Sequence, residues 1–128
     1  MDTSKVRQRV RRLDERRRKL LQRVLRPFPM VSGSLYEMRR RCGNPRCKCA
    51  GGDLHASWYL SRGHEGRTRL TYIGRIVPDW LALGVRRYKR HQKMLAAIRK
   101  VDAEISRCLN ELRDERVQSI EQARRERR

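Results

Sequence analysis

The sequence predicts an α+β fold in which helix predominates, arranged as a single domain over residues 1–128. Two long stretches with helical spacing of apolar residues lie at opposite ends of the chain, and short alternating segments with a cysteine cluster lie between them. We therefore expect an N-terminal helix over 4–26, a three-stranded antiparallel sheet with a Cys/His loop over 30–77, a long helix over 78–121 and a basic tail over 122–128.

The first helical stretch has an apolar stripe that repeats in alternating steps of four and three residues. Its members are Val6, Val10, Leu13, Leu20 and Val24, and Arg17 occupies the one place where an apolar residue is missing. This spacing is the a/d pattern of a coiled coil. Pro27 and Pro29 end the predicted helix, because proline disfavours helix both at its own position and at the preceding one.

The last third of the chain repeats the same rhythm without a gap. The stripe consists of Met94, Ile98, Val101, Ile105, Cys108 and Leu112, after Pro78 and Asp79, which suit the first turn of a helix. Each stripe covers about 27 Å of helix. Equal lengths at opposite ends of the chain predict an antiparallel coiled-coil hairpin; a homodimer through either stripe is the alternative. The basic end from Gln122 is expected to fray.

The centre of the chain alternates in the manner of strands, over residues 34–41, 58–60 and 68–73, with a glycine-containing turn at 62–66. We expect Trp58 to lie in the core; the alternative is that Trp58, Tyr59 and Tyr72 are exposed on the sheet and stack single-stranded bases. Period-two alternation predicts one apolar face that carries Tyr36, Met38, Leu70 and Tyr72, with Tyr72 also in the core. It predicts an opposite face on which adjacent strands present a row of arginines, namely Arg39, Arg41, Arg67 and Arg69.

Three cysteines lie within eight residues, at Cys42, Cys47 and Cys49, and His55 follows six residues later. Four Cys and His ligands are the usual donor set of structural zinc, so we predict one structural zinc per chain. His64 is the alternative fourth ligand. Reduced thiols without a metal, and redox or iron–sulfur chemistry, are the competing interpretations. Cys108 lies in the long helical stripe and is expected to be a buried apolar residue instead.

Charge is the strongest functional signal in the composition. There are 34 basic against 14 acidic residues, which gives a net charge of +20, and residues 3–26, 27–78 and 79–128 carry +9, +6 and +6. A nucleic acid is the polyanion that would relieve this repulsion. The predicted phosphate- or base-contacting residues are Arg11, Arg16, Arg18, Arg39, Arg41, Arg46, Lys48, Arg67, Arg69, Arg75, Arg86, Arg87, Lys89 and Arg90.

Several other classes of protein find no support in the sequence. It has no run of eighteen apolar residues and no signal-peptide segment, so we expect a cytoplasmic protein with reduced thiols and without a membrane partner. Neither a phosphate-binding G-x-x-x-x-G-K-[ST] loop nor an HExxH zinc motif occurs. We therefore expect no enzymatic activity and no small-molecule substrate.

Three central segments form a combination of motifs: Gly33-Ser-Leu-Tyr36, Arg41-Cys-Gly-Asn-Pro-Arg-Cys-Lys-Cys49, and His55 before Trp58-Tyr59-Leu60. Through them the chain resembles, over about residues 30–112, an uncharacterised family of small basic prokaryotic proteins that often occur near mobile genetic elements. His-Ala-Ser-Trp stands where that family has His-Gly-Pro-Tyr. The strand pattern is also similar, more weakly, to the arm-binding domains of phage-type integrases, whose sheet enters the DNA major groove.

Together these features predict an accessory protein that binds DNA or structured RNA on a zinc-stabilised scaffold, within a mobile-element, recombination or RNA-guided complex. A homodimer and a larger nucleoprotein complex are the two alternatives for its assembly. A protein associated with the ribosome or with structured RNA is one alternative. A coiled-coil adaptor for an acidic protein is the other, and it would lack tight binding to heparin or nucleic acid at moderate salt.

Overall fold

The computed structural model describes residues 3–52 and 54–128, which form two compact units. One unit combines the chain up to Arg26 with Lys93–Arg128, and the other is Pro27–Gln92. The long helix α2 (Asp79–Arg116) contributes its first part to the second unit and its remainder to the first. No helix among the described residues is both long enough and apolar enough to cross a membrane.

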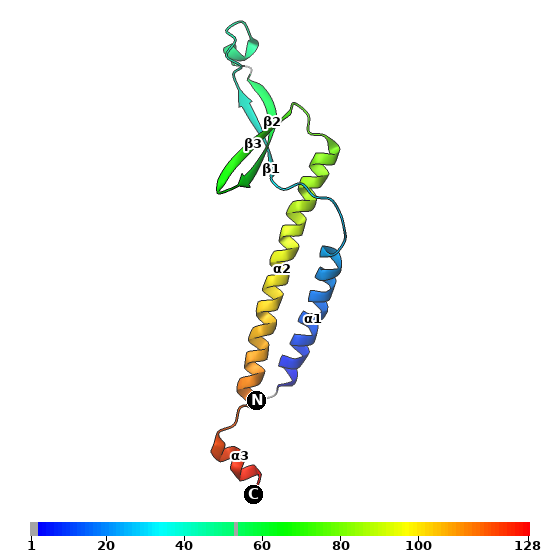
Figure 1. Cartoon of the computed structure of the whole chain (residues 1–128), viewed down its shortest axis with the longest axis vertical. Helices are drawn as coiled ribbons and strands as arrows, with labels where there is room; N and C mark the ends of the chain where they lie inside the picture. Colours follow the sequence, from blue (N-terminus) through cyan, green and yellow to red (C-terminus); the bar gives the residue numbers. More distant parts are fainter. Residues whose placement is uncertain (1–2, 53) are drawn as a thin grey trace. The chain divides into compact units, whose positions relative to one another are not determined.

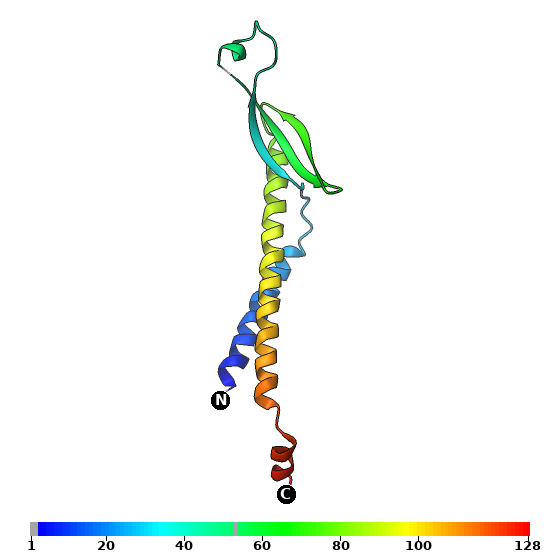
Figure 2. The same cartoon turned by 90° about the vertical axis from the view of Figure 1, so that its left-hand side faces the viewer.

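In the first unit, α1 (Ser4–Val24) packs antiparallel against the later part of α2 (Figures 1 and 2). The buried contacts come from Leu13 on α1 and from Val101 and Cys108 on α2. Partly buried apolar residues of the two predicted stripes surround them, namely Val6, Val10, Leu20 and Ile105. The predicted intramolecular hairpin is therefore confirmed, and Cys108, only 3% exposed, is the buried apolar residue that its position in the stripe predicted.

The arginine that interrupts the apolar stripe of α1 has a partner on α2. Arg17 Nε donates a hydrogen bond to Asp102 Oδ1 at 2.6 Å. Both side chains are partly exposed, so the pair adds little to the free energy of unfolding. It does favour one alignment of the helices, since sliding either helix by a turn would separate the two charges.

The C-terminal end of the chain differs from its prediction. Helix α2 ends at Arg116, before the predicted 121, and the expected frayed tail contains a further helix, α3 (Ile120–Glu126). The cause is a capping box: Ser119 Oγ accepts from the backbone N–H of Gln122, whose side-chain oxygen accepts from the backbone N–H of Ser119. This local signal begins a new helix shortly after α2 ends, eight residues beyond Leu112, the last member of the apolar stripe.

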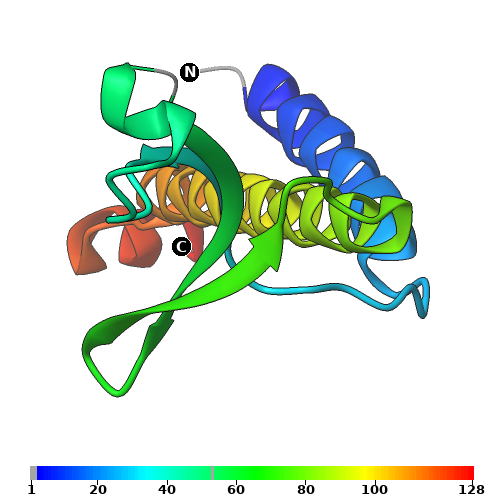
Figure 3. The ribbon, with the colours of Figure 1, turned by 90° about the horizontal axis from the view of Figure 1, so that it is seen from above.

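The second unit contains a three-stranded antiparallel sheet in the order β1-β2-β3. The strands are β1 (Ser34–Arg40), β2 (His55–His64) and β3 (Arg67–Gly74), and β2 is longer than its predicted core of 58–60. The predicted five-residue turn is a two-residue turn, Glu65-Gly66, with φ of 50° and 74°. Such turns suit the right-handed twist of a hairpin, which is visible in the β2–β3 ribbon (Figure 3).

The sheet packs on the first turns of α2 through a small apolar cluster. Leu60 on β2 and Leu81 and Val85 on α2 are buried, and Val31, Leu35, Ile73 and Val77 pack around them. The segment before β1 also lies directly against the helix, since Val31 N donates to the carbonyl oxygen of Gly84 at 3.0 Å. A Cβ atom at position 84 would lie 2.8 Å from a Val31 methyl carbon, so this close approach requires glycine.

The sequence grouped the strand residues onto faces correctly but assigned the wrong face to the core. Leu35 and Leu60 are opposite each other in the register and contact α2. Tyr36 and Tyr72 are both opposite Tyr59, so the side of the sheet that carries tyrosines points away from this cluster. Tyr72 is 62% exposed, and its prediction as a core residue is wrong; Trp58 is half-buried.

The stability of the helical hairpin can be tested by truncating one leucine in its core. Leu13→Ala removes buried methyl groups from the contact with Val101 and Cys108, and we expect it to lower the free energy of unfolding by about 2–3 kcal/mol. Leu109→Ala is the matched control, because Leu109 is 51% exposed, and its effect should stay within about 0.5 kcal/mol. Denaturant titrations followed by circular dichroism measure both. Equal effects would contradict the packing of α1 on α2.

Candidate metal centre and basic surfaces

The predicted ligands Cys42, Cys47, Cys49 and His55 come together at the loop that joins β1 to β2. Their four ligand atoms all lie within 4.8 Å of one another. Cys47 Sγ is 3.2 Å from His55 Nε2, and Cys49 Sγ is 3.4 Å from Cys42 Sγ. Zinc–sulfur bonds of 2.3 Å in a tetrahedron would place sulfur atoms about 3.8 Å apart. The observed spacing therefore fits a four-coordinate ion.

Local hydrogen bonds shape the loop that carries the three thiols. The side-chain oxygen of Asn44 accepts a hydrogen bond from the backbone N–H of Arg46, and the backbone oxygen of Asn44 accepts one from the N–H of Cys47. A short 3₁₀ helix (Lys48–Gly51) follows. Gly43 has a φ of 80°, a conformation that favours glycine and turns the chain back after β1. Cys42 is thus fixed at the end of β1, and His55 is the first residue of β2.

The cysteines have different electrostatic environments. The pKa of the Cys42 thiol is lowered, mainly by a hydrogen bond with the Asn44 backbone and secondly by a hydrogen bond with the Cys49 side chain. For Cys49 the N–H of Cys42 favours the thiolate, but burial and the neighbouring thiols of Cys42 and Cys47 outweigh this bond and raise the pKa. Crowded thiols resist losing all their protons together, and a bound cation would remove that obstacle by stabilising the thiolates.

The structure distinguishes His55 from the alternative ligand His64. His64 is at the far end of β2, where its Nε2 lies 3.6 Å from Glu65 Oε1, and it is not part of the cluster. The site can therefore hold a metal ion such as zinc through three cysteines and His55. Four protein ligands complete a tetrahedral shell and leave no position for a substrate, which is the arrangement of a structural site.

The predicted cationic residues are distributed over both units, and most are exposed. Arg11, Arg16 and Arg18 lie on α1, Arg41, Arg46 and Lys48 on the metal loop, Arg67 and Arg69 on β3, Arg75 just after β3, and Arg86, Arg87, Lys89 and Arg90 on α2. Within the described ranges, two of the predicted nucleic-acid-contacting residues form ion pairs: Arg18 pairs with Asp14, and Arg39 pairs with Glu37. Arg87 lies over the ring of Phe28, 4.9 Å from its centroid.

The predicted row of sheet arginines does not form. β2 separates β1 from β3, Arg41 lies beyond the end of β1, and Arg39 is opposite Ala56 whereas Arg69 is opposite Arg62. Six residues of strand between Ala56 and Arg62 correspond to about 20 Å. Arg39 is therefore near the metal loop, and Arg67 and Arg69 are near the hairpin turn.

The sequence reasoning missed Arg62, which joins Arg67 and Arg69 in a basic group at the hairpin. Arg62 and Arg69 are directly opposite on neighbouring strands, an arrangement that is unfavourable for like charges without an anion between or beside them. The two-residue turn at Glu65-Gly66 was the signal that could have found this pair, because it fixes the register of the hairpin.

Fold and site together define a helix-rich α+β protein with a Cys₃His cluster in the loop of an antiparallel sheet. Over residues 10–82, more than half of its length, the chain matches a family described as a domain of unknown function, DUF6788, and it belongs to that family. Comparisons with curated proteins and with solved structures found no match.

The ligand set predicts different effects for the two histidines of β2. His55→Asn removes one of the four donors and should weaken the binding of added Co²⁺ or Zn²⁺ at least tenfold, whereas His64→Asn, the matched control on the same strand, should leave it unchanged. The absorption of tetrahedral Co²⁺ measures both affinities. Loss of binding in His64→Asn alone would contradict the proposed ligands.

Proposed function

We propose that this protein is a nucleic-acid-binding accessory protein whose scaffold is held together by one structural zinc ion per chain, and that it has no catalytic activity of its own. Its partner is DNA or structured RNA, contacted mainly through phosphates. The observation that carries the proposal is the basic group at the hairpin, Arg62, Arg67 and Arg69, on a chain with a net charge of +20.

The distribution of partners for the cations supports this proposal. In the first unit, acidic residues form ion pairs with cations of the same unit, as in the pairs of Arg17 with Asp102 and of Lys19 with Glu15. In the second unit, Arg62, Arg67 and Arg69 are exposed, and among the described residues no carboxylate lies within ion-pair distance of them. A phosphate between Arg62 and Arg69 would turn their repulsion into attraction.

The metal site is proposed as structural because its four ligands enclose the ion and its neighbours are cations. Three thiolates, one neutral imidazole and Zn²⁺ carry a net charge of about −1. Arg41, Arg46 and Lys48 on the same loop would compensate this charge and still face outward, toward a polyanion. The finer part of this proposal is a role within a mobile-element, recombination or RNA-guided complex, and the resemblance to a family that often occurs near mobile genetic elements supports it.

The zinc proposal predicts one equivalent of metal per chain. Cys49→Ser should abolish bound zinc and increase amide hydrogen exchange in β1 and β2, because the ion links the ends of these strands, while α1 keeps its protection. Cys108→Ala is the control, since Cys108 lies in the helical hairpin and should keep the full zinc content. Elemental analysis of protein purified under reducing conditions measures the metal, and its absence would refute the proposal.

The nucleic-acid proposal predicts steep salt dependence. If about 6–10 phosphates are neutralised, the affinity should fall by about 10³–10⁵ between 50 and 200 mM salt. Arg69→Gln should reduce the slope of log K against log salt by about one, as expected for the loss of one phosphate contact. Arg113→Gln is the control, because Arg113 already pairs with Asp114 and should change the slope much less. A nearly flat salt dependence in the wild type would refute electrostatic binding.

A further inference from the structure

Three tyrosines form a row across the sheet on the side that faces away from the α2 contact. Tyr36 of β1 and Tyr72 of β3 are both opposite Tyr59 of the central strand. The rings of Tyr36 and Tyr59 are stacked with centroids 6.0 Å apart, and those of Tyr59 and Tyr72 meet edge to face at 5.6 Å. One ring from each strand thus contributes to a continuous aromatic surface.

This aromatic surface lies outside the two apolar clusters and is open at its β3 edge, since Tyr36 and Tyr59 are half-buried and Tyr72 is exposed. Tyr72 is 62% exposed and its neighbour Leu70 is 50% exposed, whereas Leu60 on the opposite side of the sheet is 8% exposed. Aromatic rings are costly to leave in water, and a chain with only 5% aromatic residues places three of its seven here. Their concentration on one exposed side indicates a surface for binding.

The charge around the tyrosines selects the kind of partner. Arg40 lies over the Tyr59 ring, 5.7 Å from its centroid. Among the strand residues that share this side in the register, none is acidic, and Glu37 lies on the other side. Two groups of cations lie beyond the row along the strands: Arg41, Arg46 and Lys48 follow β1 on the metal loop, and Arg62, Arg67 and Arg69 lie near the hairpin turn, at strand positions that alternate onto the other side of the sheet. Glu65 lies in the hairpin turn itself. An aromatic patch on a side of the sheet without carboxylates, with Arg40 against its central ring, fits bases attached to phosphates.

We infer that the tyrosine row binds the unpaired bases of a single-stranded nucleic acid by stacking, an inference that rests on the proposed function and names its substrate class. Stacking on aromatic side chains needs base faces, which a duplex hides within its own stack. Duplex binding through phosphates would use the arginines and leave the tyrosines without a role. RNA and DNA single strands share the required chemistry, because the rings contact bases and not sugars.

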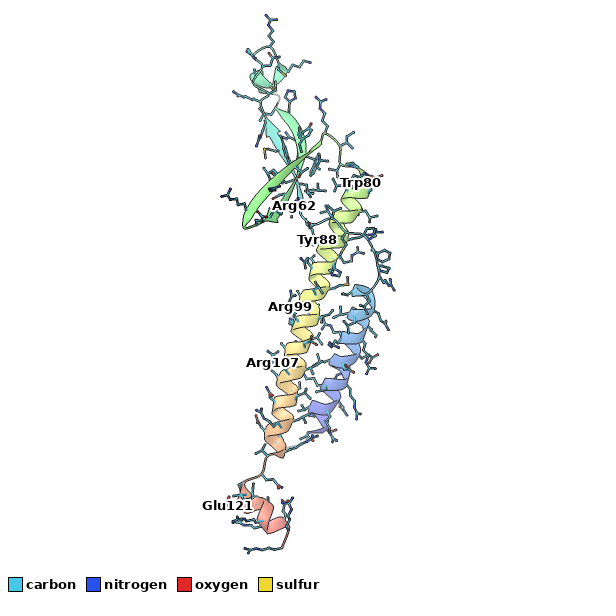
Figure 4. All side chains as sticks on the ribbon, in the orientation of Figure 1. Arg62, Trp80, Tyr88, Arg99, Arg107 and Glu121 are labelled. Carbon is cyan, nitrogen blue, oxygen red and sulfur yellow. The ribbon has the colours of Figure 1, made fainter. Side chains whose placement is uncertain are left out.

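The test measures the affinity of a fluorescent, unstructured oligoribonucleotide of about twelve nucleotides, and of its deoxy counterpart, by anisotropy at one salt concentration. Tyr72→Leu should weaken binding about 5- to 100-fold, since it removes one stacking ring, and Tyr72→Phe should bind like the wild type. Trp80→Leu is the matched control: Trp80 is 69% exposed in the first turn of α2, outside the sheet (Figure 4), and should have no effect.

Two further measurements separate this inference from the proposed function. The salt dependence of Tyr72→Leu should keep the wild-type slope, because no charge is lost. An abasic strand of equal length, which keeps the phosphates but lacks base faces, should bind the wild type at least as weakly as the normal strand binds Tyr72→Leu, because it loses stacking on all three rings. This measurement needs no variant other than Tyr72→Leu and does not depend on how a second substitution folds.

Several outcomes would overturn the inference. Equal binding of normal and abasic strands, or of Tyr72→Leu and wild type, would refute stacking while leaving the electrostatic proposal intact. Absence of binding to any nucleic acid at 50 mM salt would refute the proposed function and the inference together. A change of oligomeric state in Tyr72→Leu with unchanged affinity would identify the tyrosine row as a contact between two copies of the chain.

Discussion

Repulsion among 34 basic side chains is the constraint under which the rest of this structure is built. A net charge of +20 opposes compaction, and the sequence offers few large apolar residues to counter it. Burial is accordingly concentrated in two small clusters, one around Leu13 and Val101 and the other around Leu60 and Leu81. Outside these two clusters most of the described side chains, including most of the cations, are partly or fully exposed.

The two units meet this constraint in different ways. The helical hairpin uses acidic residues to offset its own arginines, and the ion pair of Arg17 with Asp102 occupies a place in the apolar stripe itself. The sheet unit has few carboxylates and a small core, so it needs another source of stability. Small domains with insufficient cores often rely on a bound metal. The Cys₃His cluster could hold such an ion, at the end of the sheet farthest from the hairpin turn.

Local patterns in the sequence predicted the features that depend on spacing alone. The helical hairpin of α1 and α2 was predictable because apolar residues spaced four and three apart lie on one side of a helix. The metal-ligand set was predictable because Cys42, Cys47 and Cys49 lie within one short loop. Period two likewise grouped Tyr36 with Met38 and Leu70 with Tyr72. The period-two pattern could not predict which side of the sheet packs on α2. That depends on Leu60 of β2, and the predicted β2 was shorter than the observed strand.

The missing information was the identity of the central strand. Once β2 lies between β1 and β3, Leu60 joins Leu35 against α2 and Tyr59 joins Tyr36 and Tyr72 on the open side. The predicted arginine row failed for the same reason, because it assumed that β1 and β3 were neighbours. An exposed row of tyrosines is therefore a tertiary consequence of strand order, and each strand read by itself presents an apolar alternation that suits a core equally well.

The metal loop and the tyrosine row depend on each other through the register of β1 and β2. Cys42 lies just beyond Arg40, and Arg40 is opposite His55, so an ion bound to Cys42 and His55 joins the end of one strand to the start of the next. A slip of one residue between these strands would move Tyr36 to the other side from Tyr59. The same slip would separate the metal ligands, so the proposed zinc ion would oppose it. Through this link, a metal that touches no base would hold Tyr36 beside Tyr59, while the hairpin turn fixes Tyr72 on the other side of Tyr59.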